Sequence, residues 1–549
     1  MILPPKRRGT FSIRSIILTD MRIITTLLLL CVLSACASSM STPATASPTH
    51  LPPTSTVVAF ASRDTLTSGW IGAATTPDGT TASIQITFDG SEATLNIEPR
   101  TQSWKLSLIQ NNEGIQFAAT GGTRDPFKQI EFTGTFVNSV FAGKLLWDGK
   151  TTDIAFTPIA VVDKNILEKY EGVYRFESGR ALSIIVSPEY SSDGLYFFSQ
   201  TLMLTDFESG ALRGLYPFDD YIFAVGALRV VGAPFAGRIQ FITDDVGNPT
   251  GLMWWDDVND ITPSGTSGQF AERVQYTYED VPFTSADGTK LMGRISIPES
   301  DSRVPAFMAL HGSEQGTRDN FGNKVMAHYM ISRGFAVLNY DKRGVGDSDG
   351  IYQEAASTSN LQKIAEDAIA GAEYLASRPE IDAKRIGLIG FSQAGWVIPL
   401  AASQSEAISH IVVLSGPVES TLQEDVFSSY TNDGDTATTN YDDAKITQQL
   451  RDMKPGGFDP IPVIAELNQP GLWLWGSVDK SVPVTFSAEN LQTLIDTGKN
   501  NFSYEIFPNG DHNLNESPRG LFDEIPYSPR VLFYSALAKW LENNMSKEQ

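Results

Sequence analysis

From about residue 272 to the C-terminus, short apolar runs alternate with amphipathic stretches of helical periodicity. The runs are PAFMALHG at 305–312, FAVLNYD at 335–341, RIGLIGFS at 385–392, HIVVLSG at 410–416 and GLWLWG at 471–476. Strands that are apolar on both faces must be covered on both, and this alternation is typical of a mostly parallel sheet between helices. The sequence therefore predicts an α/β domain over residues 270–549, which opens with a hairpin around an Asp287-Gly288 turn.

Helices are expected between these runs, at about 326–332, at 361–377, directly after residue 392 and at about 530–543. In the second of them, apolar residues recur with the spacing of one helix face, so this stripe would lie against the sheet. The stripe consists of Leu361, Ile364, Ala368, Ala372 and Leu375.

The chain before residue 270 has a different pattern, in which apolar and polar residues alternate as they do in half-buried strands. The stretches 57–162 and 163–268 open with similar phrases, SGWIGA and YEGVYRF, and close with the phrases LLWDG and MWWDD. We therefore expect two related antiparallel β-rich modules. Their aromatic residues would fit either a binding groove or packing within the sheet, and packing is the more common role.

The first 36 residues resemble a bacterial lipoprotein signal peptide. In the run RIITTLLLLCVLSAC, 13 uncharged, mostly apolar residues lie between the arginine and Cys36, which is fewer than the ~20 that a membrane-spanning helix needs. It ends in LSAC, which resembles a lipobox, so Cys36 would carry a lipid and anchor the protein in the cell envelope with its catalytic domain outside the cytoplasm. A plain secretory signal is the alternative, and Met21 is an alternative start. Residues 37–56, rich in Ser, Thr and Pro, are typical of a flexible tether.

The net charge and the cysteines exclude some functions. The formal net charge is −23, and it becomes −27 once residues 1–35 are removed. A protein so acidic would repel phosphate backbones, so nucleic acid is not an expected partner. Both cysteines, Cys31 and Cys36, lie near the N-terminus, so no disulfide is expected in the folded part. No cluster of Cys, His or carboxylate residues indicates a metal, and no cofactor is expected.

The segment GFSQAG at 390–395 lies between a predicted strand and a predicted helix. A serine on so sharp a turn is exposed as a nucleophile, with small residues two positions to either side of it. Gly390 fits this pattern, whereas Ala394 stands where the second glycine is usual and Gly395 follows it. The alternative role for Ser392 is to cap the helix.

With this segment, residues 270–549 resemble the α/β-hydrolase superfamily, and in particular bacterial serine esterases and serine aminopeptidase-like hydrolases with phrases such as YDKRGVGDS and SQAGW. The resemblance implies the chain order Ser, acid, His. Asp479, on the loop after GLWLWG, stands where the family has its acid. Of the five histidines only His512 follows Asp479, and it lies in a loop after the last predicted strand. His410 begins a strand that leads away from the expected site.

The resemblance also implies an oxyanion hole formed by two backbone N–H groups. One is that of Ser313, just after the strand that ends in His311-Gly312, and the other is that of Gln393, next to the nucleophile. Asp341 and Arg343 are expected to brace their loop. The insertion at 418–467 would form a cap over the pocket.

These residues predict a serine hydrolase that acts on carboxylic esters through an acyl-enzyme intermediate. The first alternative is hydrolysis of peptides or aminoacyl amides, in which an acid such as Glu419 or Glu424 would hold the substrate amine. Exposed helix charges are the more ordinary role for these two residues. A second alternative makes the β-rich modules the functional part, which would bind an envelope polymer, with the hydrolase as an accessory.

Overall fold

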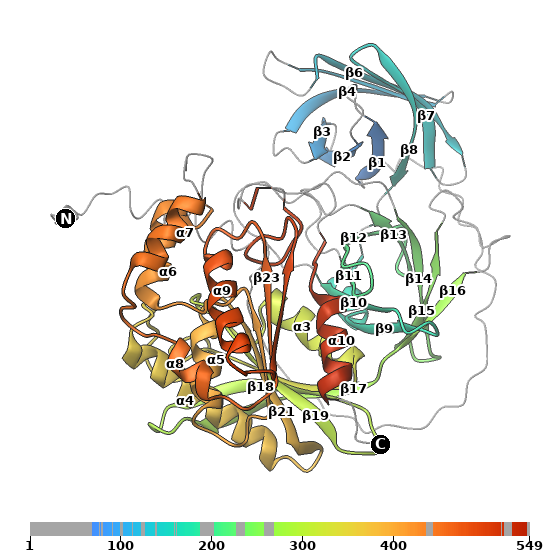
Figure 1. Cartoon of the computed structure of the whole chain (residues 1–549). Helices are drawn as coiled ribbons and strands as arrows, with labels where there is room; N and C mark the ends of the chain where they lie inside the picture. The colour runs from blue at the N-terminus through green and yellow to red at the C-terminus, as the bar shows by residue number, and fades with distance from the viewer. Residues whose placement is uncertain are drawn as a thin grey trace.

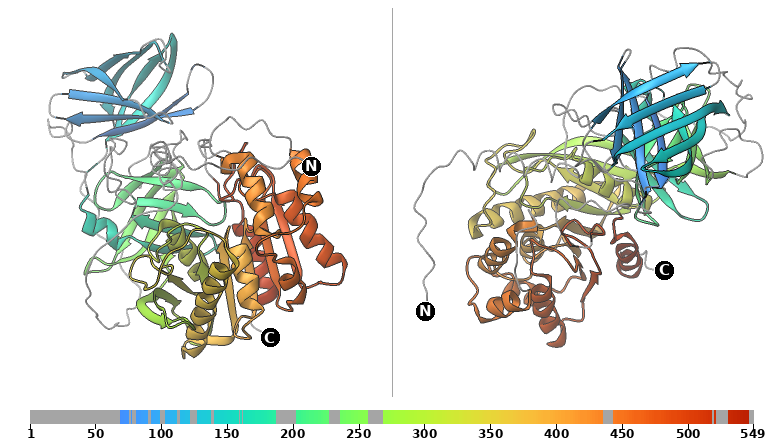
Figure 2. Two further views of the ribbon diagram at one scale, coloured as in Figure 1. Left: turned by 90° about the vertical axis from the view of Figure 1, so that its left-hand side faces the viewer. Right: turned by 90° about the horizontal axis from the view of Figure 1, so that it is seen from above.

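The computed structural model describes residues 69–545 apart from short gaps, the longest of which are 187–201, 227–235, 257–267, 435–442 and 521–529. The predicted signal peptide, Cys36 and the tether at 37–56 lie outside the described residues. Three units follow one another along the chain: two β-barrels and an α/β domain (Figure 1). The second barrel lies between the first barrel and the α/β domain (Figure 2).

The first unit is a closed barrel of eight antiparallel strands in chain order, in which β1 also pairs with β8. Its strands are β1 (Trp70–Thr75), β2 (Thr81–Asp89), β3 (Glu92–Glu98), β4 (Ser103–Asn111), β5 (Gly114–Thr120), β6 (Gln129–Val137), β7 (Val140–Trp147) and β8 (Lys150–Pro158). Aromatic side chains pack against one another inside it: the ring centroids of Trp70 and Phe141 are 4.1 Å apart, and those of Phe132 and Phe156 are 5.1 Å apart. In these positions the aromatic residues serve packing rather than a groove.

The second unit repeats this topology, with β9 paired to β16 to close the barrel. After the short helix α2 (Lys164–Lys169) its strands are β9 (Gly172–Phe176), β10 (Ala181–Val186), β11 (Leu202–Asp206), β12 (Leu212–Pro217), β13 (Ile222–Gly226), β14 (Gly237–Thr243), β15 (Pro249–Trp255) and β16 (Gln269–Arg273). The two opening phrases of the sequence lie at β1 and β9, and the two closing phrases at the ends of β7 and β15. One more strand follows each closing phrase, so the barrel extends to Arg273 rather than to the predicted boundary at 268.

The third unit is an eight-stranded sheet in the order β17-β18-β20-β19-β21-β22-β23-β24. The hairpin of β17 and β18 is antiparallel, and the strands from β20 to β24 are parallel to one another. The strands are β17 (Tyr276–Thr284), β18 (Lys290–Pro298), β19 (Val304–Leu310), β20 (Ala336–Tyr340), β21 (Ile381–Phe391), β22 (His410–Leu414), β23 (Gly471–Gly476) and β24 (Phe502–Phe507). The predicted fold class, a mostly parallel α/β sheet behind antiparallel β-rich modules, is confirmed.

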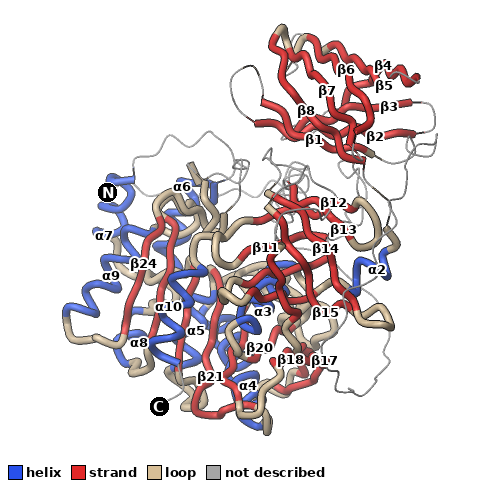
Figure 3. The backbone as a smooth tube through the Cα atoms, turned by 90° about the vertical axis from the view of Figure 1, so that its right-hand side faces the viewer, coloured by secondary structure: helices blue, strands red, loops and turns tan. Residues whose placement is uncertain are grey.

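Helices cover both faces of this sheet (Figure 3). The helices of this unit are α3 (Phe321–Ser332), α4 (Thr358–Ser377), α5 (Ala394–Ala402), α6 (Thr421–Thr431), α7 (Asp443–Asp452), α8 (Ile461–Glu466), α9 (Val484–Asp496) and α10 (Tyr534–Met545), with a 3-10 turn η2 (Asn432–Gly434). Along β23, Trp473 and Trp475 pack on the side of α4, α5, α8 and α9, whereas Leu472 and Leu474 pack on the side of α3 and α10. The predicted stripe of α4 is fully buried. None of the helices in the described ranges is both long and apolar enough to span a membrane.

The second barrel packs against α3 and α10. Phe207 of the barrel lies edge-on to Tyr329 and Tyr534, with ring centroids 5.2 and 5.1 Å away. The barrel also makes a polar contact, since Ser183 Oγ lies 2.7 Å from Nδ1 of the buried His328. Burial lowers the pKa of His328 to about 3, so this imidazole is neutral and can pair with the hydroxyl.

This junction leads directly to the loop that carries His512. Val531 N donates to the carbonyl of Gly210 in the barrel at 2.9 Å, and Leu532 N donates to Leu514 O at 2.9 Å. Segment 530–532 therefore lies between the barrel and the residues just after His512. The second barrel thus supports a loop of the α/β domain as well as its helices.

Gly210 tests the importance of this junction. Its φ is +73°, and a Cβ there would lie 2.1 Å from Val531 O, whereas Gly247 has a φ of +84° with nothing within 4 Å of a Cβ. Gly210→Ala should cost more than the roughly 1–2 kcal/mol of left-handed strain that Gly247→Ala costs, because Val531 must also move. It should also lower the thermal midpoint further and speed hydrogen exchange at Val531 and Leu532. Equal midpoints and unchanged exchange would contradict the account.

Candidate active site

Ser392 lies at the sharp turn between β21 and α5. Its φ is +55°, a left-handed conformation that a residue with a side chain adopts only when its surroundings enforce it. Its N–H donates to Leu414 O at 3.0 Å and its carbonyl accepts from Gly395 N at 2.8 Å. The N-cap of α5 is Gln393, without a side-chain cap. Ser392 therefore does not cap the helix, and it has the strained backbone expected of a nucleophile elbow.

The packing at this turn explains the departure from the usual glycine pattern. A Cβ on Gly390 would lie 2.6 Å from the Cβ of Ala394 and 2.8 Å from Leu310 O, so position 390 needs glycine. A Cβ on Gly395 would lie 2.7 Å from the backbone of Gly416. The side chain of Ala394 occupies the space beside Gly390. Gly395, rather than residue 394, is the glycine that lets the start of α5 approach the backbone of Gly416.

Asp479 and His512 are in direct contact, as an acid and base pair would be. Asp479 follows β23, its side chain is 0% exposed, and its Oδ2 lies 2.9 Å from His512 Nδ1. The other oxygen, Oδ1, accepts from the backbone N–H groups of Ser481 and Val482 at 2.8 and 3.0 Å. With Nδ1–H donating to the carboxylate, His512 Nε2 is left as the basic nitrogen.

The electrostatics favour this role. Burial lowers the pKa of His512, but the Asp479 carboxylate and the hydrogen bond to it raise the pKa above its ordinary value. Asp511, adjacent in sequence, instead accepts from Asn513 N and Asn515 N through Oδ1, both at 2.9 Å. Burial raises the pKa of Asp511 to about 6. Asp511 therefore stabilises its own turn and does not orient the imidazole.

The other predicted site residues lie at the same end of the sheet. A Cβ on Gly312 would lie 3.3 Å from the Cβ of Ser392, so the peptide before Ser313 passes beside the nucleophile. Within the described ranges, neither Ser313 N nor Gln393 N donates to another protein group, so both are free to face a substrate. Ser392 Oγ makes no hydrogen bond to His512 among the described residues; such contacts are often long until substrate binds.

His311 and His410 have structural partners. His311 Nε2 donates to Tyr340 O at 2.6 Å, and its Nδ1 lies 3.5 Å from Glu314. His410 Nε2 lies 2.9 Å from Asn544 O, near the C-terminal end of α10. Both rings therefore hold elements in place rather than acting on a substrate.

The loop after β20 is braced as the sequence suggested. Asp341 accepts from Arg318 N at 2.7 Å and from Asp347 N at 2.9 Å. Arg343 forms a bidentate pair with Asp367 of α4 at 2.7 and 2.6 Å. Lys342, between them, was not singled out from the sequence. Its Nζ donates to Gly312 O at 2.6 Å, next to the predicted oxyanion hole. The sequence signal that could have indicated it is a lysine two positions after a mostly apolar strand.

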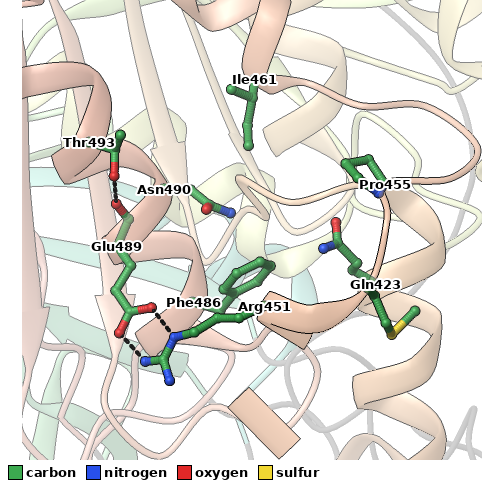
Figure 4. Close-up of a pocket in the computed structure, with 9 residues that line it drawn as sticks. Gln423, Arg451, Pro455, Ile461, Phe486, Glu489, Asn490 and Thr493 are labelled. Atoms are coloured by element: carbon green, nitrogen blue, oxygen red, sulfur yellow. Dashed lines mark hydrogen bonds and ion pairs between the residues drawn. The ribbon is translucent and has the colours of Figure 1, made fainter. Parts of the chain in front are cut away.

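The insertion at 418–467 folds into α6, α7 and α8, although residues 435–442 lie outside the described ranges. Thr431, at the end of α6, donates through Oγ1 to Lys480 O on the loop of Asp479. A pocket of about 360 Å³ lies between these helices and α9 (Figure 4). Its lining residues are Gln423, Arg451, Met453, Pro455, Ile461, Phe486, Glu489, Asn490 and Thr493. None of them is one of the predicted triad residues Ser392, Asp479 and His512.

The interpretation of Glu419 as an exposed helix charge is wrong. Glu419 is 0% exposed and precedes α6, and its Oε2 accepts from Ser487 Oγ and from Val418 N. Burial raises its pKa to about 8. Glu424 on α6 is partly buried, and burial, with Glu419 nearby, raises its pKa well above the ordinary value. Sequence alone gave no sign of this burial, which arises from packing between α6 and α9.

Comparison with known proteins agrees with this geometry. The sequence model described as "Prolyl oligopeptidase family" matches residues 322–526. Thiohydrolase aneE of Aspergillus aculeatus is 29% identical over 159 residues, which cover 28% of this chain and 46% of that protein. Acylamino-acid-releasing enzyme 1 of Oryza sativa subsp. japonica is 22% identical over 276 residues, 48% of this chain and 33% of that protein. Esterase EstD of Thermotoga maritima is 24% identical over 247 residues, which cover 40% of this chain and 57% of that protein. The matched part spans about half the length of these relatives or less.

The acid–base contact can be tested with a fluorophosphonate probe, which labels activated serines. Asp479→Asn should slow labelling of Ser392 by about 10³–10⁴-fold, because an amide holds the imidazole in the wrong tautomer. Asp511→Asn is the matched control and should stay within about threefold of the wild type. Equal rates for the two variants would contradict the assignment of Asp479.

The family match at 322–526 includes the elbow at Ser392 and the Asp479–His512 pair. These residues also follow the chain order Ser, acid, His that the resemblance implies. The α/β domain is therefore an α/β-hydrolase-fold domain of the serine hydrolase type, and its residues 322–526 are similar to the prolyl oligopeptidase family.

Proposed function

We propose that this protein hydrolyses carboxylic esters at Ser392 through an acyl-enzyme intermediate. The observation that carries the proposal is the left-handed Ser392 at the elbow, at the same sheet edge as the hydrogen-bonded Asp479–His512 pair. A strained serine beside a buried acid–base pair suits nucleophilic attack on an acyl carbon.

The reaction then runs in two halves. His512 Nε2 takes the proton of Ser392 as Oγ attacks the acyl carbon, and the N–H groups of Ser313 and Gln393 stabilise the tetrahedral oxyanion. Collapse of this intermediate expels the alcohol, which receives the proton from His512. Water then attacks the acyl-enzyme with His512 as the base, which releases the acid and restores Ser392.

The environments of Glu419 and Glu424 support an ester over an aminoacyl substrate. An exopeptidase needs an ionised acid within reach of the substrate amine. Glu419 is fully buried, and burial raises its pKa to about 8, which favours its neutral form at neutral pH. Burial also raises the pKa of Glu424 well above its ordinary value. A neutral carboxyl holds an ammonium group weakly. Peptide hydrolysis remains the second candidate because of the family match.

Paired substrates distinguish the two. The whole chain and its Ser392→Ala variant would be assayed on short-chain nitrophenyl esters and on aminoacyl nitroanilides. We expect ester turnover at least about 100-fold above amide turnover, and its loss by at least about 10³-fold in the variant. Comparable amide turnover would favour a peptidase. Ester turnover that survives in Ser392→Ala would contradict the proposal.

We further propose that Cys36 is lipidated and anchors the enzyme to a membrane of the bacterial cell envelope. Only the lipobox-like LSAC and the apolar run before it support this, and they lie outside the described residues. Cys36→Ser should abolish incorporation of labelled palmitate and release the protein from the membrane fraction, whereas Cys31→Ser should change neither. Continued labelling of Cys36→Ser would contradict the proposal.

A further inference from the structure

Lys342 is a buried cation for which the mechanism above has no role. The residue is 1% exposed and lies two positions after the end of β20. Its Nζ donates to Gly312 O at 2.6 Å and to the side-chain Oε1 of Gln393 at 3.1 Å. One ammonium group thus joins the two segments that carry the predicted oxyanion donors.

The contact with Gly312 fixes the direction of the Ser313 N–H. The carbonyl of Gly312 and the N–H of Ser313 belong to one planar trans peptide, so they point in opposite directions. With the carbonyl held toward Lys342, the N–H points away from it. The Lys342 backbone also binds this loop, because its N–H donates to Gly316 O at 3.0 Å. The peptide therefore has little freedom to rotate.

The contact with Gln393 anchors the second donor. The side-chain Oε1 of Gln393 accepts a hydrogen bond from Lys342, and its Nε2 donates to Glu354 O at 3.4 Å. The Gln393 backbone N–H makes no hydrogen bond within the described residues. Because the residue is held from its side chain, its N–H keeps one orientation at the start of α5.

We propose that Lys342 is a positioning residue that aligns the N–H groups of Ser313 and Gln393 toward the oxyanion. This inference rests on the ester hydrolysis proposed above. It gives a role to a residue that is neither in the predicted triad nor among the predicted oxyanion donors. Donors fixed in place before the reaction stabilise the oxyanion without reorganisation, so their alignment affects kcat more than KM.

The charge on Lys342 gives this role a pH dependence. Burial lowers the pKa of Lys342 to about 8, and the nearby carboxylates of Glu314, Asp367 and Glu354 oppose that decrease. The ring of Tyr352 also faces the ammonium, with its centroid 5.5 Å from Nζ. Lys342 is therefore charged below about pH 8 and loses its proton above it, which weakens both hydrogen bonds. Activity should decline on that alkaline side.

Lys342→Met keeps most of the length of the side chain and removes the ammonium. We expect kcat on a nitrophenyl ester to fall about 10- to 100-fold, with KM within about threefold, since misaligned donors retain part of their effect. A boronic acid, which mimics the tetrahedral intermediate, should bind more weakly by the same factor. The alkaline decline near pH 8 should disappear.

Lys499→Met is the matched control, because Lys499 Nζ also donates to a backbone carbonyl, Leu467 O at 2.8 Å. Lys499 precedes β24, whereas His512 follows it, so the two residues lie at opposite ends of that strand. Lys499→Met should leave kcat unchanged. If Lys342→Met does not fold, Gln393→Leu tests the same link, and it should lower kcat by about tenfold with KM unchanged.

The outcomes separate the two proposals. If the wild type shows no turnover that depends on Ser392, ester hydrolysis and the role of Lys342 fail together. If the wild type is active but Lys342→Met has an unchanged kcat and the same decline in activity above pH 8, only the role of Lys342 is overturned. An unchanged kcat in Gln393→Leu, used in its place, would have the same meaning. A change in KM alone would also overturn it, because that would be an effect on substrate binding.

Discussion

The parallel strands of the α/β domain are apolar on both faces, and the rest of the structure depends on covering both of them. One face is buried under α4, α5, α8 and α9, and the other under α3 and α10, against which the second barrel packs with Phe207 and its neighbours. Buried apolar surface contributes roughly 25 cal/mol per Å². With both faces occupied, only the strand ends remain for chemistry, and the loops after β19, β21, β23 and β24 carry the predicted site residues.

The elements of the α/β domain could be predicted because their signals are local. Apolar runs gave the central strands, and the stripe of α4 gave its buried face. The β-rich modules were recognisable from alternation, but alternation does not say which strand pairs with the first. Closure of each barrel depends on contacts such as Trp70 with Pro158 and Ala271 with Phe176, which are distant in sequence. That is why the end of the second barrel, in β16, was placed a few residues too early.

The candidate site also has residues that local signals could predict and residues whose surroundings depend on distant contacts. Ser392, Asp479 and His512 could be named from motif, strand context and chain order, and the structure brings the last two into contact. Burial of Glu419 and Lys342 could not be foreseen, because it is created by segments far away along the chain: Ser487 contacts Glu419, and Gly312 and Gln393 contact Lys342. Ionisable groups are costly to bury in their charged forms, so each buried one in a structure needs a physical explanation.

The proposed mechanism requires Ser392 to carry the acyl group. The most direct measurement is mass spectrometry of the protein quenched with acid during ester turnover, followed by peptide mapping. We predict a mass increase equal to the acyl group, located on the peptide that contains Ser392. Turnover without an adduct, or an adduct on another residue, would contradict the claim.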